Sequence, residues 1–454
     1  MNDKLQISLM KGFFETGSTR SIPFRAQQLR ILARALEKHE TQLHGALYAD
    51  LHKSPCDAYA SETGFVQSDI RHALKNLRRW SRPRRAAVPA GLQPARARVV
   101  PEPKGTVLII GPWNYPVQLV LSPLVAAIAA GNCAVIKPSE LTPHTAAALR
   151  KLIEEAFDPR FVRLIEGGRE TAEALLAEPF DQIFFTGGTE AGRNVAQAAA
   201  RQLIPVTLEL GGKCPAVVGR DADIPVAVRR IVRGKFMNAG QTCVAPDHVW
   251  VPRIQLPAFL EELQKTITAF YGENPQQSSD YGRIVNRHHF DRLTTLCPGC
   301  IRDAGSLYIA PSVIVNPPRN SALMQDEIFG PLLPVLPYDT VEEIIAFCKA
   351  RPTPLALYLF TNDPAQRRRL MDAIPSGGVC INDTINQLIP RELPFGGRGA
   401  SGLGAYHGKA GFDTFSHFRS VLIRSSRFDS PVLYPPSKLS LRALKKIYRF
   451  FVGD

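Results

Sequence analysis

The sequence lacks the cysteine pattern of a disulfide framework. Its eight cysteines are spread over 454 residues, at positions 56, 133, 214, 243, 297, 300, 348 and 380. Disulfide-rich secreted proteins concentrate their cysteines in a short chain. The spacing therefore favours a reducing compartment, and we expect a cytoplasmic protein.

An uninterrupted membrane-spanning or secretory segment is also missing. The N-terminus, MNDKLQISLMKGFFETGSTR, has no long apolar core, so we expect no export signal. The uncharged stretch 105–136 is long enough to cross a bilayer, but Asn114, Pro123 and Asn132 interrupt it. Because its ends are β-rich and its middle is alanine-rich, the stretch predicts a buried β-α-β unit.

Acidic residues are absent from one basic segment, and no nucleic-acid-binding module accompanies it. The formal net charge is +14, and residues 78–100 hold seven arginines, no acid and a single aromatic, Trp80. Nucleic-acid sites usually interleave aromatic with basic residues or carry a recognisable module. We therefore expect no nucleic-acid partner. There is no internal repeat or low-complexity linker either.

The chain shows the alternating pattern of an α/β protein. Residues 24–50 repeat apolar positions at three and four, which predicts an amphipathic helix pair. Farther along, helical patterns alternate with five predicted strands: TVLIIGP, CAVIKP, FVRLIEG, DQIFFTGG and PVTLELGG. This order predicts a doubly wound, mostly parallel sheet, which binds ligands at the carboxyl ends of its strands. A second α/β region follows from about residue 211 to 390.

Three local motifs do not fit the sites that they suggest. Residues 397–402 match GxGxxG but follow no full apolar strand, and no acidic residue lies about twenty positions on. The Cys297 and Cys300 pair has no second pair to complete a metal site. His288 and His289 lack the spacing of metal ligands, so we expect these two histidines on the surface. No metal site is expected.

The stretch NAGQTCVAP places Cys243 alone among small and amide residues. A lone cysteine can be a buried hydrophobe, but one chemistry combines it with two other groups found here. Oxidation of an aldehyde by a nicotinamide needs a thiolate nucleophile, a base that activates water, and donors for an oxyanion. Cys243, Glu209 and Asn114 supply one of each, at predicted strand ends or loops.

At this point the chain resembles the aldehyde dehydrogenases of the class 3 type. The motifs that carry the resemblance cover nearly the whole chain: PWNYP, KPSE, FTGGT, LELGGK, GKFMNAGQTCVAPD, MQDEIFGP, SGGVCINDT, LPFGGRGASGLGAYHGK and FSHFRS. The resemblance implies an aldehyde dehydrogenase fold, a homodimer, and NAD(P)-dependent oxidation of an aldehyde to a carboxylic acid. It implies a dinucleotide-binding domain in 1–85 and 101–210, a catalytic domain in 211–390, and oligomerisation segments in 86–100 and 391–454.

The resemblance also assigns the catalytic residues. Cys243 is expected to be the nucleophile, Glu209 the general base, and the Asn114 amide with the Cys243 backbone N–H the oxyanion hole. The residues alone leave open that Glu209 merely caps a strand. Since the nucleophile must be partly thiolate, we expect a lowered pKa for the Cys243 thiol, with help from the positive nicotinamide ring.

The expected cofactor is NAD, with NADP also accepted. The resemblance assigns the adenosine ribose to Lys137 and Glu140. It assigns the pyrophosphate to Gly187, Gly188 and Thr189. It assigns the nicotinamide ribose and ring to Glu327 and Phe329. From the residues alone, Glu140 could instead be an exposed neighbour of a helix N-cap.

Two departures from the family pattern concern the substrate entrance. Gln387 stands where the family commonly has histidine, and residues 296–307 are shorter than the usual glycine-containing loop. The sequence leaves the substrate open between medium- or long-chain aliphatic and aromatic aldehydes. Two rival functions are a thiol esterase that uses the same cysteine without a dinucleotide, and a basic scaffold or nucleic-acid binder with an idle enzyme fold.

The tail 437–454, SKLSLRALKKIYRFFVGD, is basic and amphipathic when drawn as a helix. The apolar face holds Leu441, Leu444, Ile447, Tyr448 and Phe451, and the opposite face holds Lys438, Arg442, Lys445, Lys446 and Arg449. This pattern suits a helix that lies on a membrane surface. It also suits a helix whose apolar face packs on the enzyme or on a dimer partner.

Overall fold

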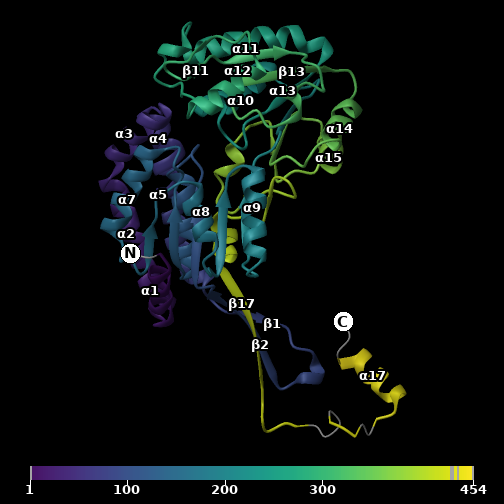
Figure 1. The fold of residues 1–454 in the computed structure, drawn as a ribbon. Helices are drawn as coiled ribbons and strands as arrows, with labels where there is room; N and C mark the ends of the chain where they lie inside the picture. Colours follow the sequence, from purple (N-terminus) through teal and green to yellow (C-terminus); the bar gives the residue numbers. More distant parts are fainter. Residues whose placement is uncertain (1–2, 430–433, 437–438, 452–454) are drawn as a thin grey trace.

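The computed structural model describes residues 3–429, 434–436 and 439–451. Two six-stranded sheets, each flanked by helices, make up the body, and a three-stranded arm extends from it (Figure 1). This confirms the predicted α/β class with a doubly wound parallel sheet.

The first sheet has the strand order β16-β7-β6-β3-β4-β5. Its strands are β3 (Thr106–Ile110), β4 (Cys133–Lys137), β5 (Val162–Leu164), β6 (Gln182–Thr186), β7 (Val206–Glu209) and β16 (Gly402–Leu403). The first five are parallel and are the five predicted strands, whereas β16 runs antiparallel at the edge. The stretch 105–136 is β3, a helix and β4, as predicted, and not a membrane span.

Helices cover both faces of the first sheet. They are α6 (Gln118–Ala130), α7 (Pro143–Ala156), α8 (Arg169–Leu176) and α9 (Thr189–Ala200). Right-handed crossovers that move in opposite directions along a sheet leave their helices on opposite faces, so α6 and α7 cover one face and α8 and α9 the other. An outer layer of α2 (Ile22–Lys38), α3 (Glu40–Leu51) and α5 (Gly64–Trp80) packs on α6 and α7. The predicted helix pair in 24–50 is α2 and α3.

The second sheet is parallel throughout, with the order β12-β13-β9-β8-β14-β15. Its strands are β8 (Pro215–Val218), β9 (His248–Pro252), β12 (Ser312–Val315), β13 (Leu332–Tyr338), β14 (Ala356–Phe360) and β15 (Gly378–Ile381). One face packs on α10 (Ile224–Phe236), α11 (Leu256–Tyr271) and α12 (Arg287–Leu296). The other face packs on α14 (Val341–Lys349) and α15 (Pro364–Ala373). Each face therefore buries its own apolar core.

The antiparallel arm joins β1 (Arg84–Ala86), β2 (Ala95–Pro103) and β17 (Ser416–Arg424). The arm thus reaches beyond the predicted segment 86–100 at both ends. The segment predicted as 391–454 is divided, because β16 joins the first sheet and α16 (Gly408–Thr414) packs on α6 before β17 enters the arm. Pairing with an edge strand and burial against α6 hold these residues on the body of the protein.

The described part of the tail forms α17 (Leu441–Phe451), which lies apart from both sheets (Figure 1). Leu441 is 67% and Tyr448 is 59% exposed, so these apolar side chains do not pack on the body of the same chain. Lys438 and residues 452–454 lie outside the described residues. Within the described ranges, no helix has both the length and the apolar composition that crossing a membrane requires.

Candidate active site

A cleft of about 750 Å³ lies at the carboxyl ends of β3, β6 and β7, where loops of the second sheet meet the first. All the predicted site residues line it except Lys137 and Glu140: Asn114, Gly187, Gly188, Thr189, Glu209, Cys243, Glu327 and Phe329. Parallel strands end at the same edge of a sheet, which is why residues distant in sequence meet here. The structure thus brings the cysteine, the carboxyl and the amide into one cleft.

An unusual backbone conformation precedes Cys243. Asn238, Ala239 and Gly240 are all left-handed, with φ of 52°, 52° and 76°. A Cβ on Gly240 would lie 2.3 Å from the carbonyl oxygen of Gly330, so only glycine fits there. Non-glycine residues adopt this conformation at a cost, which the surrounding contacts must offset. The loop that carries the thiol is therefore held by its surroundings.

The amide side chains of the NAGQTC stretch supply those contacts. Gln241 donates from Nε2 to the carbonyls of Asn238 (3.0 Å) and Arg283 (2.9 Å) and accepts from the N–H of Val285 (3.0 Å). Asn238 Nδ2 donates to the Asn114 carbonyl at 2.8 Å, and Asn114 Nδ2 donates to the Gln241 carbonyl at 3.1 Å. This last bond orients the Asn114 amide and leaves its second N–H available to a ligand. Amides surround Cys243 because they tie its loop to the turn that follows β3.

The protonation of Cys243 differs from the sequence prediction. Burial raises the pKa of its thiol above the ordinary value, and the nearby carboxyls of Glu327 and then Glu209 raise it further. The prediction of a lowered pKa is therefore wrong for the protein alone. The reason is that water is largely excluded and neighbouring groups are acidic, both of which oppose a thiolate.

Glu209 is the last residue of β7 and is only 2% exposed. Its backbone is fixed on both sides, since its carbonyl accepts from Gly187 N–H at 3.0 Å and β16 pairs Gly402 with it. Neither carboxyl oxygen has a hydrogen-bond partner among the described residues. Burial raises the pKa of Glu209 well above its ordinary value. The neighbouring edge strand β16 begins at Gly402, which is the last glycine of the GxGxxG stretch.

A buried ion pair fixes the loop that carries Glu327. Lys213 Nζ contacts Asp247 Oδ1 at 2.5 Å and donates to the carbonyls of Leu323 (2.8 Å) and Asp326 (2.9 Å). The other oxygen of Asp247 accepts from the Ile328 N–H at 2.8 Å. Three of these hydrogen bonds therefore hold residues 323–328 against Lys213, in the loop after β7, and against Asp247, which precedes β9.

Glu327 projects from this loop over the backbone of Gly211. A Cβ on Gly211 would lie 2.0 Å from Glu327 Oε2, so the glycine makes room for the carboxyl. Burial, with a contribution from Asp247, raises the pKa of Glu327 to about 8. The carboxyl is therefore a hydrogen-bond donor as well as an acceptor at neutral pH.

An aromatic group forms one wall of the cleft. Trp113 contacts Phe329 edge-to-face, with ring centroids 5.2 Å apart, and lies 5.0 Å from the ring of His289. His288 is exposed as predicted, but the surface prediction is wrong for His289, because α12 turns it towards the cleft. Burial, aided by Arg292 and His288, lowers the pKa of His289 to about 4, so it is neutral near pH 7.

The predicted cofactor residues occupy two places. Gly187 and Gly188 precede the N-terminus of α9, which begins at Thr189 and points its free backbone N–H groups into the cleft. Lys137 ends β4 at the same sheet edge, where its Nζ pairs with Glu140 Oε2 at 2.9 Å. The cleft also contains three arginines that motif reasoning missed: Arg193, Arg292 and Arg351. They come from separate elements, so no local pattern could have predicted them.

These groups fit a dinucleotide. A helix N-terminus preceded by two glycines, together with arginine side chains, suits a pyrophosphate. The Lys137 and Glu140 pair offers both a donor and an acceptor for ribose hydroxyls. Trp113 and Phe329 together give the cleft an aromatic wall, which suits a nicotinamide ring.

The structure also shows the surroundings of Gln387 and of the short loop after α12, the two departures from the family pattern. Gln387 Nε2 donates to the Tyr358 hydroxyl at 3.2 Å, and that hydroxyl donates to the carbonyl of Val244, which directly follows Cys243. The half-buried Cys297 and Cys300 close a turn after α12, with the Cys300 N–H donating to the Cys297 carbonyl at 3.1 Å.

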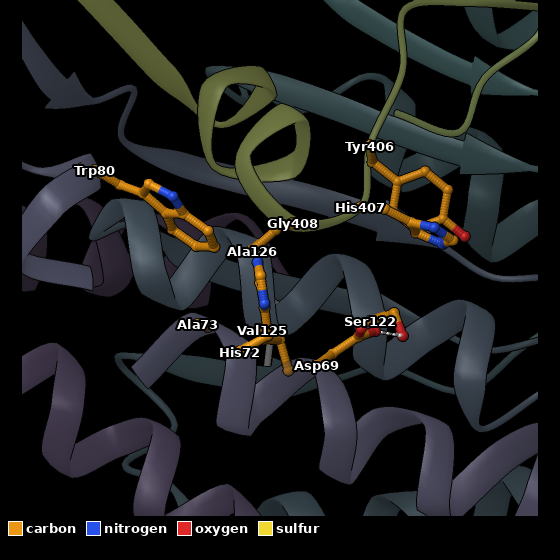
Figure 2. A pocket seen from close by; sticks show the side chains of 10 residues that line it. All are labelled: Asp69, His72, Ala73, Trp80, Ser122, Val125, Ala126, Tyr406, His407 and Gly408. Atoms are coloured by element: carbon orange, nitrogen blue, oxygen red, sulfur yellow. Dashed lines mark hydrogen bonds between the residues drawn. The ribbon is translucent and has the colours of Figure 1, made fainter. Parts of the chain in front are cut away.

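A second, much smaller cavity lies between α5, α6 and residues 406–408 (Figure 2). Asp69 accepts a hydrogen bond from Ser122 at 2.6 Å on one side of it, and Tyr406 and His407 lie on the other. Its volume of about 20 Å³ accommodates about one water molecule. It is therefore too small to bind an aldehyde or a nucleotide.

The fold and the cleft define an α/β enzyme with a cysteine beside a dinucleotide-type sheet edge. The chain belongs to the aldehyde dehydrogenase family, whose model matches residues 7–421. It is therefore an oxidoreductase that acts on an aldehyde with NAD or NADP, and its relatives include the class 3 type that the sequence resembles.

Three known proteins illustrate the likeness. A 4,4'-diaponeurosporen-aldehyde dehydrogenase of Staphylococcus aureus is 46% identical, covering 97% of each chain. A dimeric NADP-preferring aldehyde dehydrogenase of Canis lupus familiaris is 44% identical, covering 93% of this chain and 95% of its own. A substrate-bound structure of Staphylococcus aureus AldH superposes with a TM-score of 0.96 at 46% identity, covering 99% of this chain and 100% of that one.

Proposed function

We propose that this aldehyde dehydrogenase works through a covalent adduct on Cys243. The observation that supports this most strongly is the convergence, in one cleft, of the thiol, the unpartnered carboxyl of Glu209 and the oriented amide of Asn114. We further propose that its substrate is a medium- or long-chain aliphatic or an aromatic aldehyde.

The Cys243 thiol loses its proton to water, and the resulting thiolate adds to the aldehyde carbon, forming a C–S bond and an oxyanion. The free N–H of the Asn114 amide and the backbone N–H of Cys243 stabilise this oxyanion. The carbon then loses hydride, which leaves a thioester on Cys243. In its ionised form, Glu209 takes a proton from water; the water oxygen attacks the thioester, and the C–S bond breaks to release the carboxylic acid and the thiolate.

The cofactor supplies hydride acceptance when it is bound. Gly187, Gly188 and Thr189 hold the pyrophosphate through the N-terminus of α9. Glu327 and Phe329 hold the nicotinamide ribose and ring. Lys137 and Glu140 hold the adenosine ribose. The negative charge of Glu140 repels a 2′-phosphate, so the chain prefers NAD moderately over NADP.

The parts of the fold have separate roles in this proposal. Residues 1–85 and 101–210 bind the dinucleotide, and residues 211–390 complete the catalytic site. The exposed strands of the arm mediate a homodimer. Support comes from the relative named dimeric, which aligns over 93% of this chain.

We propose a cytoplasmic protein in which α17 makes peripheral contact with an anionic membrane. The helix exposes Leu441 and Tyr448 on one side, and it carries four basic residues: Arg442, Lys445, Lys446 and Arg449. Basic amphipathic helices bind membrane surfaces by combining apolar burial with charge attraction. The competing reading is that the partner subunit covers the apolar face.

The covalent mechanism is tested by Cys243→Ala. Reduced nicotinamide is followed by absorbance with a panel of aldehydes, and cofactor binding is measured separately. The variant should lose several powers of ten in rate yet keep its cofactor affinity. Cys56→Ala, at an exposed cysteine, is the matched control and should keep the wild-type rate.

A Cys243→Ala variant that retains a tenth of the wild-type rate would show that another group is the nucleophile. The esterase alternative is tested in the same series. It requires turnover of activated esters without a dinucleotide, together with no aldehyde oxidation.

A further inference from the structure

A second buried ion pair lies behind the site and takes no direct part in the proposed chemistry. Lys53 Nζ lies 2.6 Å from Glu62 Oε1, and both side chains are 0% exposed. Burying two charges costs more than burying apolar side chains of the same size, so such a pair is weak support for stability. Its contacts indicate what else it does.

The local backbone is shaped to aim Glu62 inward. Glu62 lies in a π-helical turn, Tyr59–Thr63, inserted between α4 (Pro55–Ala58) and α5. One extra residue in a turn shifts the direction of the side chains that follow, and such turns are frequent at functional sites. Here it places the carboxylate beneath the start of α6.

Glu62 anchors the turn that contains Asn114. Its Oε2 accepts from the backbone N–H of Val117 at 3.0 Å and of Gln118 at 2.8 Å. These are among the free N–H groups at the start of α6, where a carboxylate is favoured by charge and by hydrogen bonding. Asn114 precedes Val117 by three residues, so the carboxylate fixes one end of its turn.

Lys53 holds the same turn by a different contact. Its Nζ lies 3.8 Å from the centre of the Tyr115 ring. The Tyr115 hydroxyl in turn lies 2.7 Å from the Thr242 hydroxyl, and Thr242 directly precedes Cys243. The pair is thus connected to the turn of Asn114 on one side and to the loop of the nucleophile on the other.

We propose that Lys53 and Glu62 are positioning residues that fix residues 113–118, and with them the Asn114 amide, against the Cys243 loop. This inference rests on the proposed role of Asn114 in the oxyanion hole. Oxyanion donors act only within a narrow range of distances, and small misplacements at a reacting centre cost about 100-fold in rate. A charged pair that makes three contacts with such a turn holds it more rigidly than a single apolar contact does.

The test replaces the pair by Lys53→Met with Glu62→Gln, which keeps the size of both side chains and removes both charges together. Single-turnover formation of reduced nicotinamide is measured with saturating NAD and aldehyde, in the wild-type and in the Asn114→Ala background. In the wild-type background, we expect a rate about 10- to 100-fold lower. Cofactor affinity should change by less than about twofold, because the pair does not contact the cleft residues.

The Asn114→Ala background separates positioning from general stability. If the pair acts through Asn114, adding the pair substitutions to Asn114→Ala should lower the rate by less than about threefold more. Leu152→Ala, at a fully buried position of α7, is the control for lost stability and should keep the wild-type rate per folded molecule. If the double variant does not fold, Glu62→Gln alone serves under the same criteria, since it removes the carboxylate that accepts from Val117 and Gln118.

A pair variant within about threefold of the wild-type rate would overturn the inference, as would an equal loss in both backgrounds. A wild-type rate for Asn114→Ala itself would refute the proposed oxyanion role, and the inference with it. If Asn114→Ala lowers the rate but the pair variant does not, the positioning inference is refuted and the proposed oxyanion role of Asn114 is kept.

Discussion

Glu209→Gln tests the proposed division of labour between the thiol and the base. Glutamine keeps the size of the side chain and its place at the end of β7, but it cannot take a proton from water. Addition of the thiol and loss of hydride should persist for one turnover, after which the thioester stalls. We expect a burst of about one reduced nicotinamide per site, followed by a steady state slower by about 10² to 10⁴.

The structure also predicts how the substitution changes stability. Glu209 is buried, lacks a hydrogen-bond partner among the described residues, and has a pKa raised well above its ordinary value. The folded state therefore holds this proton more tightly than the unfolded state does. Wild-type stability is lost as pH rises from the unfolded pKa of about 4.3 through the raised folded pKa, by about 1.4 kcal/mol per pH unit. Glutamine carries no such proton.

Stopped-flow absorbance gives the burst, and urea unfolding from pH 5 to 8 gives the free energy of unfolding. The variant should gain stability relative to the wild type as pH rises. Glu178→Gln, at a buried glutamate in the loop after α8, is the matched control and should keep the wild-type steady-state rate. An unchanged steady-state rate in Glu209→Gln would assign water activation elsewhere, with Glu327 as the next candidate. A stability difference that does not vary with pH would contradict the buried, proton-holding carboxyl.

Three further results are expected. Because the nicotinamide ring is positive, adding NAD should shift the pH profile of Cys243 alkylation by iodoacetamide to lower pH; an unshifted profile contradicts activation by the cofactor. Glu140→Gln should raise kcat/KM for NADP relative to NAD by about fivefold, since a charge repulsion near 4 Å in water is about 1 kcal/mol, and a wild-type enzyme that clearly prefers NADP refutes the role of Glu140. A chain that ends at Pro436 should lose salt-sensitive sedimentation with anionic vesicles, and equal binding by both chains would exclude a membrane role for α17.

The five parallel strands of the first sheet could be predicted because local sequence carries their signals. Apolar runs of four or five residues, ended by glycine or proline loops, marked β3, β4, β5, β6 and β7. The short strand β16 was not predicted, because two residues, Gly402 and Leu403, carry no periodicity of their own. Only pairing with β7 makes them a strand.

The residues of the candidate site could be predicted from the sequence, but their burial and their pKa values could not. Motifs identified Cys243, Glu209 and Asn114, but they gave the wrong direction for the thiol pKa and left His289 on the surface. Both depend on which groups exclude water around a side chain, and those groups come from distant segments.

By itself, the sequence determined the alternation of strands and helices, the family, and the residue types available for chemistry, since these depend on neighbours along the chain. Tertiary structure alone decided the burial of Glu209, the protonation of Cys243, and the ion pair of Lys53 and Glu62 behind the Asn114 turn. The physical reason is that desolvation and charge interaction depend on distance in space, and folding brings together residues that the sequence keeps far apart.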